Sequence, residues 1–200
     1  MKNQNLLDLR TTKFLYVLAF CIGLISCKKS EYSNLVRSEM SKNIIHDTLF
    51  LGMTFGQSKQ EFFDKCWKLN SKGLVTHGPN NQYVAYNLPI KEGDSLTKSI
   101  RMLFYGIFND EMNMTGMNVQ YSYNAWSLWN KSLQPDKLIP AVKDTLKKWF
   151  PGNDFIKVKM KKNEKELFVK VDGNRRIIIK PIDDNRELKV RIDDLRYALD

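Results

Sequence analysis

The feature of this sequence that most restricts its fold is an order of periodicities that occurs twice: a helical pattern followed by several short alternating runs. The first helical pattern begins at Ser58 and Glu61, which form the S-x-x-E arrangement that caps the start of a helix. We expect this helix to run from about Lys59 to Leu69, with one buried apolar face. The residues of that face are Phe62, Phe63, Cys66, Trp67 and Leu69.

A second helical pattern follows Asp136, which is a suitable N-cap residue, and ends at Pro151-Gly152. Pro140 is expected within the first turn of this helix, where a missing N–H costs little. The apolar stripe predicted for it comprises Leu138, Ile139, Val142, Leu146, Trp149 and Phe150.

Runs of β type follow each helical pattern, separated by turn residues. Ile156 and Val158 alternate with lysines, so one face of this part of the sheet is expected to meet solvent. Asp172-Gly173 predicts a two-residue hairpin, and a weakly alternating run predicts a strand over 44–52. The other predicted strands are 74–77, 82–88, 98–108 and 114–123 after the first helix, and 156–161, 167–171, 175–182 and 187–192 after the second.

These patterns predict the α+β class, with two successive units of a helix plus a four-stranded antiparallel meander and the helices packed on one sheet face. The globular domain is expected over 44–200, with possible halves 44–130 and 131–200. Spacing alone leaves open whether the strands form one eight-stranded sheet or two four-stranded layers.

The first 26 residues have the order of a signal peptide. Lys2, Arg10 and Lys13 precede an uncharged apolar run from Phe14 to Ser26. At about 1.5 Å per residue this run spans roughly 20 Å, which is less than the roughly 30 Å of a bilayer core. We therefore expect residues 1–26 to be a targeting segment that is removed.

The sequence Leu24-Ile25-Ser26-Cys27 resembles the lipobox of bacterial lipoproteins. That resemblance implies cleavage before Cys27 and attachment of acyl chains, such as palmitate, at the Cys27 thiol and the new amino terminus. Two or three acyl chains make a stable membrane anchor. The alternatives are a secreted chain that is cut elsewhere and a buried cysteine.

Polar residues after Cys27 predict a flexible tether over 27–43. Lys28 and Lys29 stand where an inner-membrane retention signal of enteric bacteria has Asp. By the resemblance, the protein is expected in the cell envelope, lipid-anchored to the outer membrane.

The stretch "LGMTFGQSKQEF", residues 51–62, together with the order of elements, is similar to small periplasmic lipoproteins of the outer-membrane assembly and β-lactamase-inhibitor-like class. Proteins of that class bind other proteins and have no catalytic apparatus. The resemblance therefore implies an envelope protein as the partner, without naming it.

Charge and cysteine content exclude some classes of function. Removal of residues 1–26 leaves 32 − 3 = 29 basic and 22 − 1 = 21 acidic residues, a net charge of +8. The basic residues are interleaved with acidic ones and form no arginine-rich arm, so nucleic-acid binding is not predicted. Cys66 would be the remaining free thiol, and its position on the helix face predicts a small buried residue.

The sequence offers little catalytic chemistry. His46 and His77 have no metal-ligand spacing with a second His or a Cys, so no metal site and no cofactor are predicted. Pairing of Cys66 with a histidine as a nucleophile would need spatial adjacency and a third orienting group. The carboxylate pairs Asp183-Asp184 and Asp193-Asp194 are expected to be turn residues rather than an acid and base.

The candidate binding residues are four aromatic side chains, Tyr121, Tyr123, Trp126 and Trp129, which suit stacking on a sugar or anchoring a peptide. The alternative is that they pack in the core between the two halves. The first functional hypothesis is a non-catalytic, lipid-anchored interaction or assembly module. The second is an envelope hydrolase or carbohydrate-binding accessory protein, which would be favoured by a cleft that joins Trp126 or Trp129 to two carboxylates.

Overall fold

The computed structural model describes residues 30–90, 95–159, 165–180, 183 and 186–198. The chain divides into two units, residues 1–34 and 35–200. The described part of the first unit is residues 30–34, where Ser33 N–H donates a hydrogen bond to Ser30 Oγ at 3.1 Å. Helix α2 (Glu31–Ser41) begins there and continues into the second unit, which contains the whole sheet.

The second unit contains, among its described residues, the helices α3 (Lys59–Ser71), α4 (Pro135–Trp149) and α5 (Leu195–Ala198). Its strands are β1 (Thr76–His77), β2 (Val84–Asn87), β3 (Ile100–Phe108), β4 (Met114–Tyr123), β5 (Ile156–Lys159), β6 (Glu166–Asp172), β7 (Arg175–Ile179) and β8 (Leu188–Asp194).

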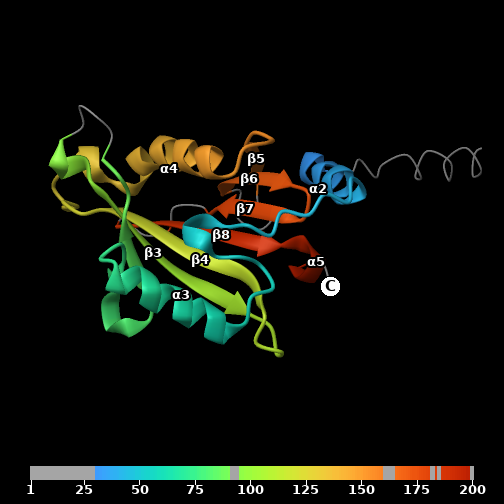
Figure 1. Ribbon diagram of the computed structural model, residues 1–200. Helices are drawn as coiled ribbons and strands as arrows, with labels where there is room; N and C mark the ends of the chain where they lie inside the picture. Colours follow the sequence, from blue (N-terminus) through green and yellow to red (C-terminus); the bar gives the residue numbers. More distant parts are fainter. Residues whose placement is uncertain (1–29, 91–94, 160–164, 181–182, 184–185, 199–200) are drawn as a thin grey trace, which may run out of the picture. The chain divides into compact units, whose positions relative to one another are not determined.

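The strands form one eight-stranded antiparallel sheet in the order β1-β2-β3-β4-β8-β7-β6-β5 (Figure 1). The prediction of two successive helix plus four-stranded meander units packed on a sheet face is therefore wrong. The two runs of strands are joined because β4 pairs with β8, from Gly116 opposite Asp193 to Tyr121 opposite Leu188. This pairing satisfies strand edges that two separate meanders would leave open at β4 and β8.

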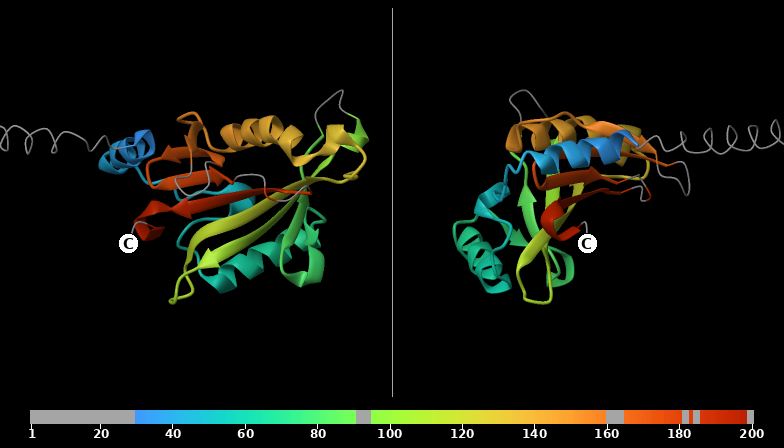
Figure 2. Two further views of the ribbon diagram at one scale, coloured as in Figure 1. Left: turned by 180° about the vertical axis from the view of Figure 1, so that it is seen from behind. Right: turned by 90° about the vertical axis from the view of Figure 1, so that its right-hand side faces the viewer.

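One face of the sheet carries the hydrophobic core. Met102 and Phe104 on β3 lie opposite Tyr121 and Val119 on β4, and all four side chains are buried. Phe62 of α3 belongs to the same core. Strand directions rotate along the sheet, so β3 and β4 run obliquely to β6 and β7 (Figures 1 and 2). The residues that α4 adds to the core are Leu138, Val142 and Leu146.

Both long predicted helices are confirmed, but α4 starts earlier than expected. It begins at Pro135, with Gln134 as an N-cap residue that makes no side-chain cap. Asp136 therefore lies in the first turn, where it pairs with Lys137 at 2.8 Å. Pro140 is in the second turn, not the first, on the exposed side of the helix.

The segment before α3 differs from the prediction of a strand over 44–52. Thr48 makes a single bridge to Thr54, and the chain reverses between them at Leu51 (φ 54°) and Gly52 (φ 72°). Leu49 N–H donates to Met53 O at 2.8 Å across this reversal. A local turn thus takes the hydrogen bonds that a strand would have offered to the sheet.

Residues 31–41, within the segment 27–43 that was predicted to be a flexible tether, form helix α2 instead. Its Glu39 is buried and accepts a hydrogen bond from Gly173 N–H at 3.1 Å, in the loop of the β6–β7 hairpin. Burial opposes the charge of Glu39, but hydrogen bonds from Lys42 and Gly173 hold its pKa below the usual value. The predicted hairpin is confirmed, but its two-residue loop is Gly173-Asn174 rather than Asp172-Gly173, because Asp172 pairs with Arg175.

Candidate functional site

Helix α3 forms one wall of the candidate site and is fixed at its start. Glu61 N–H donates to Ser58 Oγ at 3.2 Å, and Ser58 N–H donates to Glu61 Oε2 at 2.7 Å, which completes the predicted capping box. The hydrogen bond from Ser58 N–H lowers the pKa of Glu61. Lys65 Nζ ties the helix to the preceding loop through Gly52 O at 2.8 Å and Gln57 Oε1 at 2.7 Å.

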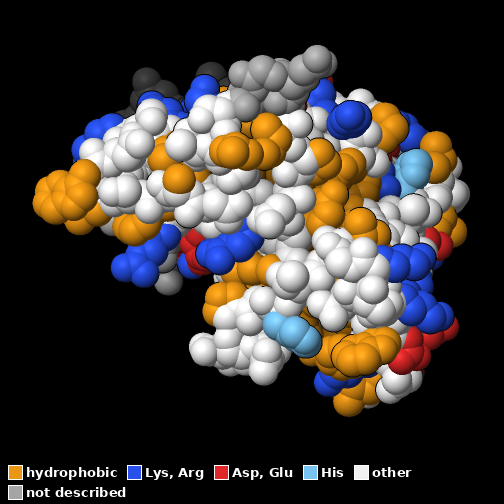
Figure 3. All heavy atoms as spheres, turned by 60° about the vertical axis from the view of Figure 1, so that its left-hand side comes forward, with side chains coloured by type: hydrophobic (Ala, Val, Ile, Leu, Met, Phe, Trp, Pro, Cys, Tyr) orange, Lys and Arg blue, Asp and Glu red, His pale blue; other side chains and the backbone are white. Residues whose placement is uncertain are grey.

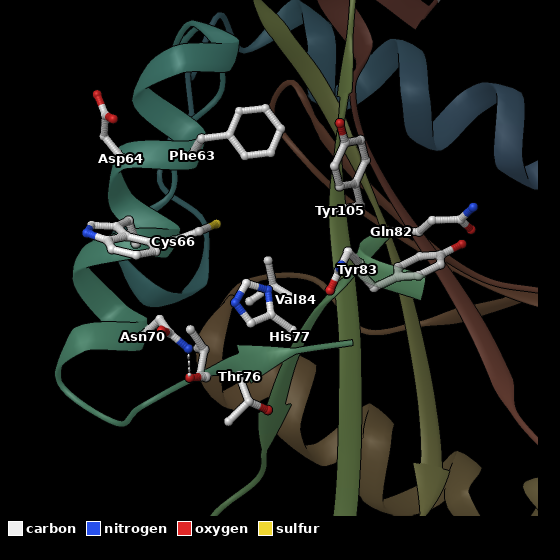
Figure 4. A pocket seen from close by; sticks show the side chains of 13 residues that line it. Phe63, Asp64, Cys66, Asn70, Thr76, His77, Gln82, Tyr83, Val84 and Tyr105 are labelled. Atoms are coloured by element: carbon white, nitrogen blue, oxygen red, sulfur yellow. Dashed lines mark hydrogen bonds between the residues drawn. The ribbon is translucent and has the colours of Figure 1, made fainter. Parts of the chain in front are cut away.

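A mostly apolar hollow of about 480 Å³ lies between α3 and strands β1 and β2 (Figure 4). Phe63 and Trp67, one turn apart on α3, border it and are 44% and 70% exposed. Tyr105 on β3 and Tyr83, the residue before β2, line it from the opposite side. Large aromatic side chains exposed around an apolar hollow are typical of a binding surface. The other lining residues are Asp64, Cys66, Asn70, Val75, Thr76, His77, Asn81, Gln82 and Val84.

The hollow lies where α3 meets the edge of the sheet at β1 and β2. After α3 the chain turns at Gly73 (φ 69°) into the two-residue strand β1. Asn70 Nδ2 donates a hydrogen bond to Val75 O at 2.9 Å across this turn. Of the apolar face predicted to be buried, Phe62 and Cys66 are buried, whereas Phe63 and Trp67 are not. That prediction was wrong for the two residues that border the hollow.

Cys66 and His77 both line this hollow, yet no hydrogen bond joins them among the described residues (Figure 4). Burial raises the pKa of the Cys66 thiol to about 11, so the thiol is neutral near pH 7. His46 lies elsewhere, where its backbone N–H donates to Asn174 Oδ1 at 2.6 Å. The geometry therefore gives Cys66 no base and no thiolate.

The four aromatic candidates do not form one cluster. Tyr121 is fully buried and Tyr123 is buried, both on the core face of β4. Trp126 is partly buried and lies under the Arg186 guanidinium, whose carbon is 5.3 Å from the ring centroid. Trp129 is 86% exposed. Two of the four residues thus belong to the core, as the alternative interpretation has it, and two lie at the surface.

Two further hollows lie next to the first, and Gln82 and Tyr83 line all three. The middle hollow, of about 450 Å³, is also lined by Asn118. The third, of about 490 Å³, is lined by Arg101 and Trp126. Figure 3 shows this side of the molecule indented, with basic side chains along one border and hydrophobic side chains along the other.

Asp193 and Asp194 are not arranged as an acid and base, and the prediction that they are turn residues is wrong, because both belong to β8 and are buried. Asp193 is buried, and its carboxylate oxygens lie 2.8 Å from Arg176 Nη2 and 2.5 Å from Arg191 Nε. Asp194 is fully buried and bound by Arg196, and this hydrogen bond is the main cause of a raised pKa of Arg196. Neighbouring strand residues point to opposite faces, so Asp193 and Asp194 do not face one another. Asp183 is exposed, and Asp184 lies outside the described residues.

The predicted lipid attachment residue Cys27 and the leader also lie outside the described residues. Within the described ranges, no helix is both long and apolar enough to cross a bilayer. The same residues contain no group of three or more His, Cys, Asp or Glu side chains placed to bind a metal ion.

Comparison with protein-family models, with curated protein sequences and with solved structures found no match. The site must therefore be argued from its own residues. The sequence prediction missed Phe63 and Trp67 as site residues, although it placed both on the apolar face of α3. The signal that could have found them is the width of that face: at 100° per residue it covers an arc of about 160°, more than the roughly 100° stripe that a helix needs to cover a core.

Proposed function

We propose that the protein is a lipid-anchored, non-catalytic binding protein of the cell envelope that docks an apolar side chain of a partner protein in the hollow beside α3. The single observation that carries the docking role is the exposure of Phe63 and Trp67 around an apolar hollow of about 480 Å³. Burial of a Trp side chain in an interface supplies a large part of the binding free energy of many complexes.

The anchored, outer-membrane part of this proposal depends on the sequence Leu24-Ile25-Ser26-Cys27. The Cys27→Ala variant should lose incorporation of labelled palmitate and retention in the membrane fraction, while the folded domain remains intact. Labelled palmitate in the Cys27→Ala protein would contradict lipid attachment at this residue.

The hydrolase alternative lacks the geometry that would favour it. Trp126 lines the third hollow, and Glu187 is the sole carboxylate among the described residues that line it. Both glycosidase mechanisms need two carboxyl groups on either side of the scissile bond. The described residues therefore favour binding over hydrolysis.

Docking at α3 is tested by photo-crosslinking in intact envelopes. The probe p-benzoylphenylalanine replaces Trp67 in one variant and Trp129, a still more exposed tryptophan outside the three hollows, in the matched control. We expect a discrete protein adduct from position 67, and its loss when Phe63→Glu is added. Equal adducts from positions 67 and 129, or none from position 67, would contradict the docking role.

A further inference from the structure

The partner chemistry follows from the way the three hollows are arranged on the sheet. The first is mostly apolar, the middle one is lined by three side-chain amides and three aromatic side chains, and the third carries two arginines. An occupant that extends across all three must therefore change from apolar to anionic along its length. This inference rests on the proposed docking role of the first hollow and adds the identity of the occupant.

The spacing of the two ends can be derived from the strand register. Tyr105, which lines the first and middle hollows, and Arg101, which lines the third, lie on the same face of β3 four residues apart. Tyr105 is opposite Asn118 and Arg101 is opposite Ser122 on β4. At about 3.4 Å per residue, the distance along the strand is roughly 14 Å, the length of four extended residues.

The third hollow has an excess of positive charge. Arg101 is exposed and makes no ion pair with any described residue. Arg186 lies over Trp126, and Glu187 supplies the one carboxylate of the described lining. Lys189 Nζ lies between two carboxylates, 3.7 Å from Glu187 Oε1 and 3.6 Å from Asp183 Oδ1, so the two arginines of the lining still exceed its one carboxylate. Guanidinium groups bind carboxylates through two parallel hydrogen bonds, so the hollow suits an acidic side chain.

The middle hollow distinguishes a peptide from a lipid. Gln82 and Asn118 are exposed and line it, and each offers both a donor and an acceptor. A peptide backbone can satisfy these amides, whereas a hydrocarbon chain would cover them without hydrogen bonds, at a cost in free energy.

We propose that the three hollows bind an extended peptide segment of the partner, with an aromatic or aliphatic side chain in the first hollow and an Asp or Glu about four residues away at Arg101 and Arg186. Charge complementarity at the third hollow and the amides of the middle hollow specify this occupant.

The test uses the purified protein and fluorescein-labelled synthetic peptides, with binding measured by fluorescence polarisation. Each peptide has one Trp and two adjacent Glu residues, with the nearer Glu one, four or seven positions from the Trp along the chain, Ser and Thr in the positions between them, and both orders are made. Matched peptides have Gln or Lys in place of Glu. We expect one order with the four-residue separation to bind best, at least tenfold tighter than its Gln form at low salt, with a smaller ratio at high salt.

Protein variants locate the two ends. Arg101→Gln should abolish most of the preference for Glu, whereas Arg37→Gln, an exposed arginine of α2 outside the three hollows, should leave it unchanged. Trp67→Ala should weaken Glu and Gln peptides alike by about tenfold, and Trp129→Ala should weaken neither.

The outcomes separate this inference from the docking role. Equal binding of Glu and Gln peptides that still requires Trp67 overturns the acidic occupant and leaves the docking role standing. Absence of binding by every peptide at millimolar concentration overturns both. Tighter, Arg101-dependent binding to phosphatidylglycerol vesicles than to any peptide overturns the peptide occupant in favour of an anionic lipid.

Discussion

Replacement of Tyr121 by phenylalanine should stabilise the protein. The side chain is fully buried, and its hydroxyl has no hydrogen-bond partner among the described residues. Its neighbours in register are Met102 on β3 and Leu188 on β8, which are also fully buried and apolar. Burial also raises the pKa of Tyr121, so the phenol stays neutral. This hydroxyl is therefore desolvated without compensation.

The size of the effect follows from that arrangement. A buried hydroxyl without a partner destabilises the folded state by about 1–3 kcal/mol. Its removal in Tyr121→Phe leaves a small void, which cancels part of the stability gained. We expect the free energy of unfolding to rise by about 1 kcal/mol, with the melting temperature higher by about 3 °C.

Urea unfolding followed by tryptophan fluorescence measures this change. Tyr123→Phe is the matched control, because the Tyr123 hydroxyl donates to Lys137 O at 3.4 Å and its loss should destabilise by about 0.5–1 kcal/mol. The two substitutions remove the same atom from residues two apart on β4, and opposite signs are expected. A lower midpoint for Tyr121→Phe would show that its hydroxyl has a partner and would refute the reasoning.

Three other perturbations test the packing and the site. Asp194→Asn should lower the free energy of unfolding in urea by about 2 kcal/mol, less than the 3–5 kcal/mol of a fully buried pair, because the Arg196 side chain is 34% exposed; an unchanged midpoint would contradict this. Gly173→Ala should cost more than about 1 kcal/mol in the same assay, because φ is +53° and the new Cβ would meet the carbonyl oxygen of Ile44. Since the pKa of the Cys66 thiol is about 11, the rate of its alkylation by iodoacetamide, mapped by mass spectrometry, should still increase above pH 10. The free energy of unfolding should fall as the pH rises from about 9 through 11, because the unfolded chain loses this proton at a lower pH than the folded protein. A rate that levels near pH 9 would indicate an unperturbed thiol.

Local signals made helices α3 and α4 and most strands predictable, but not α2, which lies in the predicted tether. The capping box of Ser58 and Glu61 fixes the start of α3, and the turn at Gly173 fixes the β6–β7 hairpin, because each acts within a few residues. The start of α4 was harder to predict, since Pro135 opens the helix without a side-chain cap, and Asp136, a residue type typical of an N-cap, lies inside the first turn.

The order of the strands could not be predicted in the same way. Alternation shows which residues of a strand share a face, but it does not identify the neighbouring strand. Val119 on β4 and Val190 on β8 are paired in the centre of the sheet, although each would equally suit the edge of a four-stranded meander. The choice is made by pairing between distant segments, which satisfies two apolar edges at once, and no local pattern reports it.

The candidate site combines both situations. Phe63 and Trp67 could be found from the sequence, because they extend the apolar arc of α3 beyond the width that the core needs. An uncovered apolar surface in a folded protein is typical of a binding site. Arg101 could not be found in this way, because its place in the site depends on the pairing of β2 with β3. That pairing sets Val84 opposite Phe104, which brings Tyr83 into the same hollow as Arg101. The helix alone therefore predicts an apolar surface without a defined partner. The arginine charges that specify the proposed occupant reach the site only when the sheet forms.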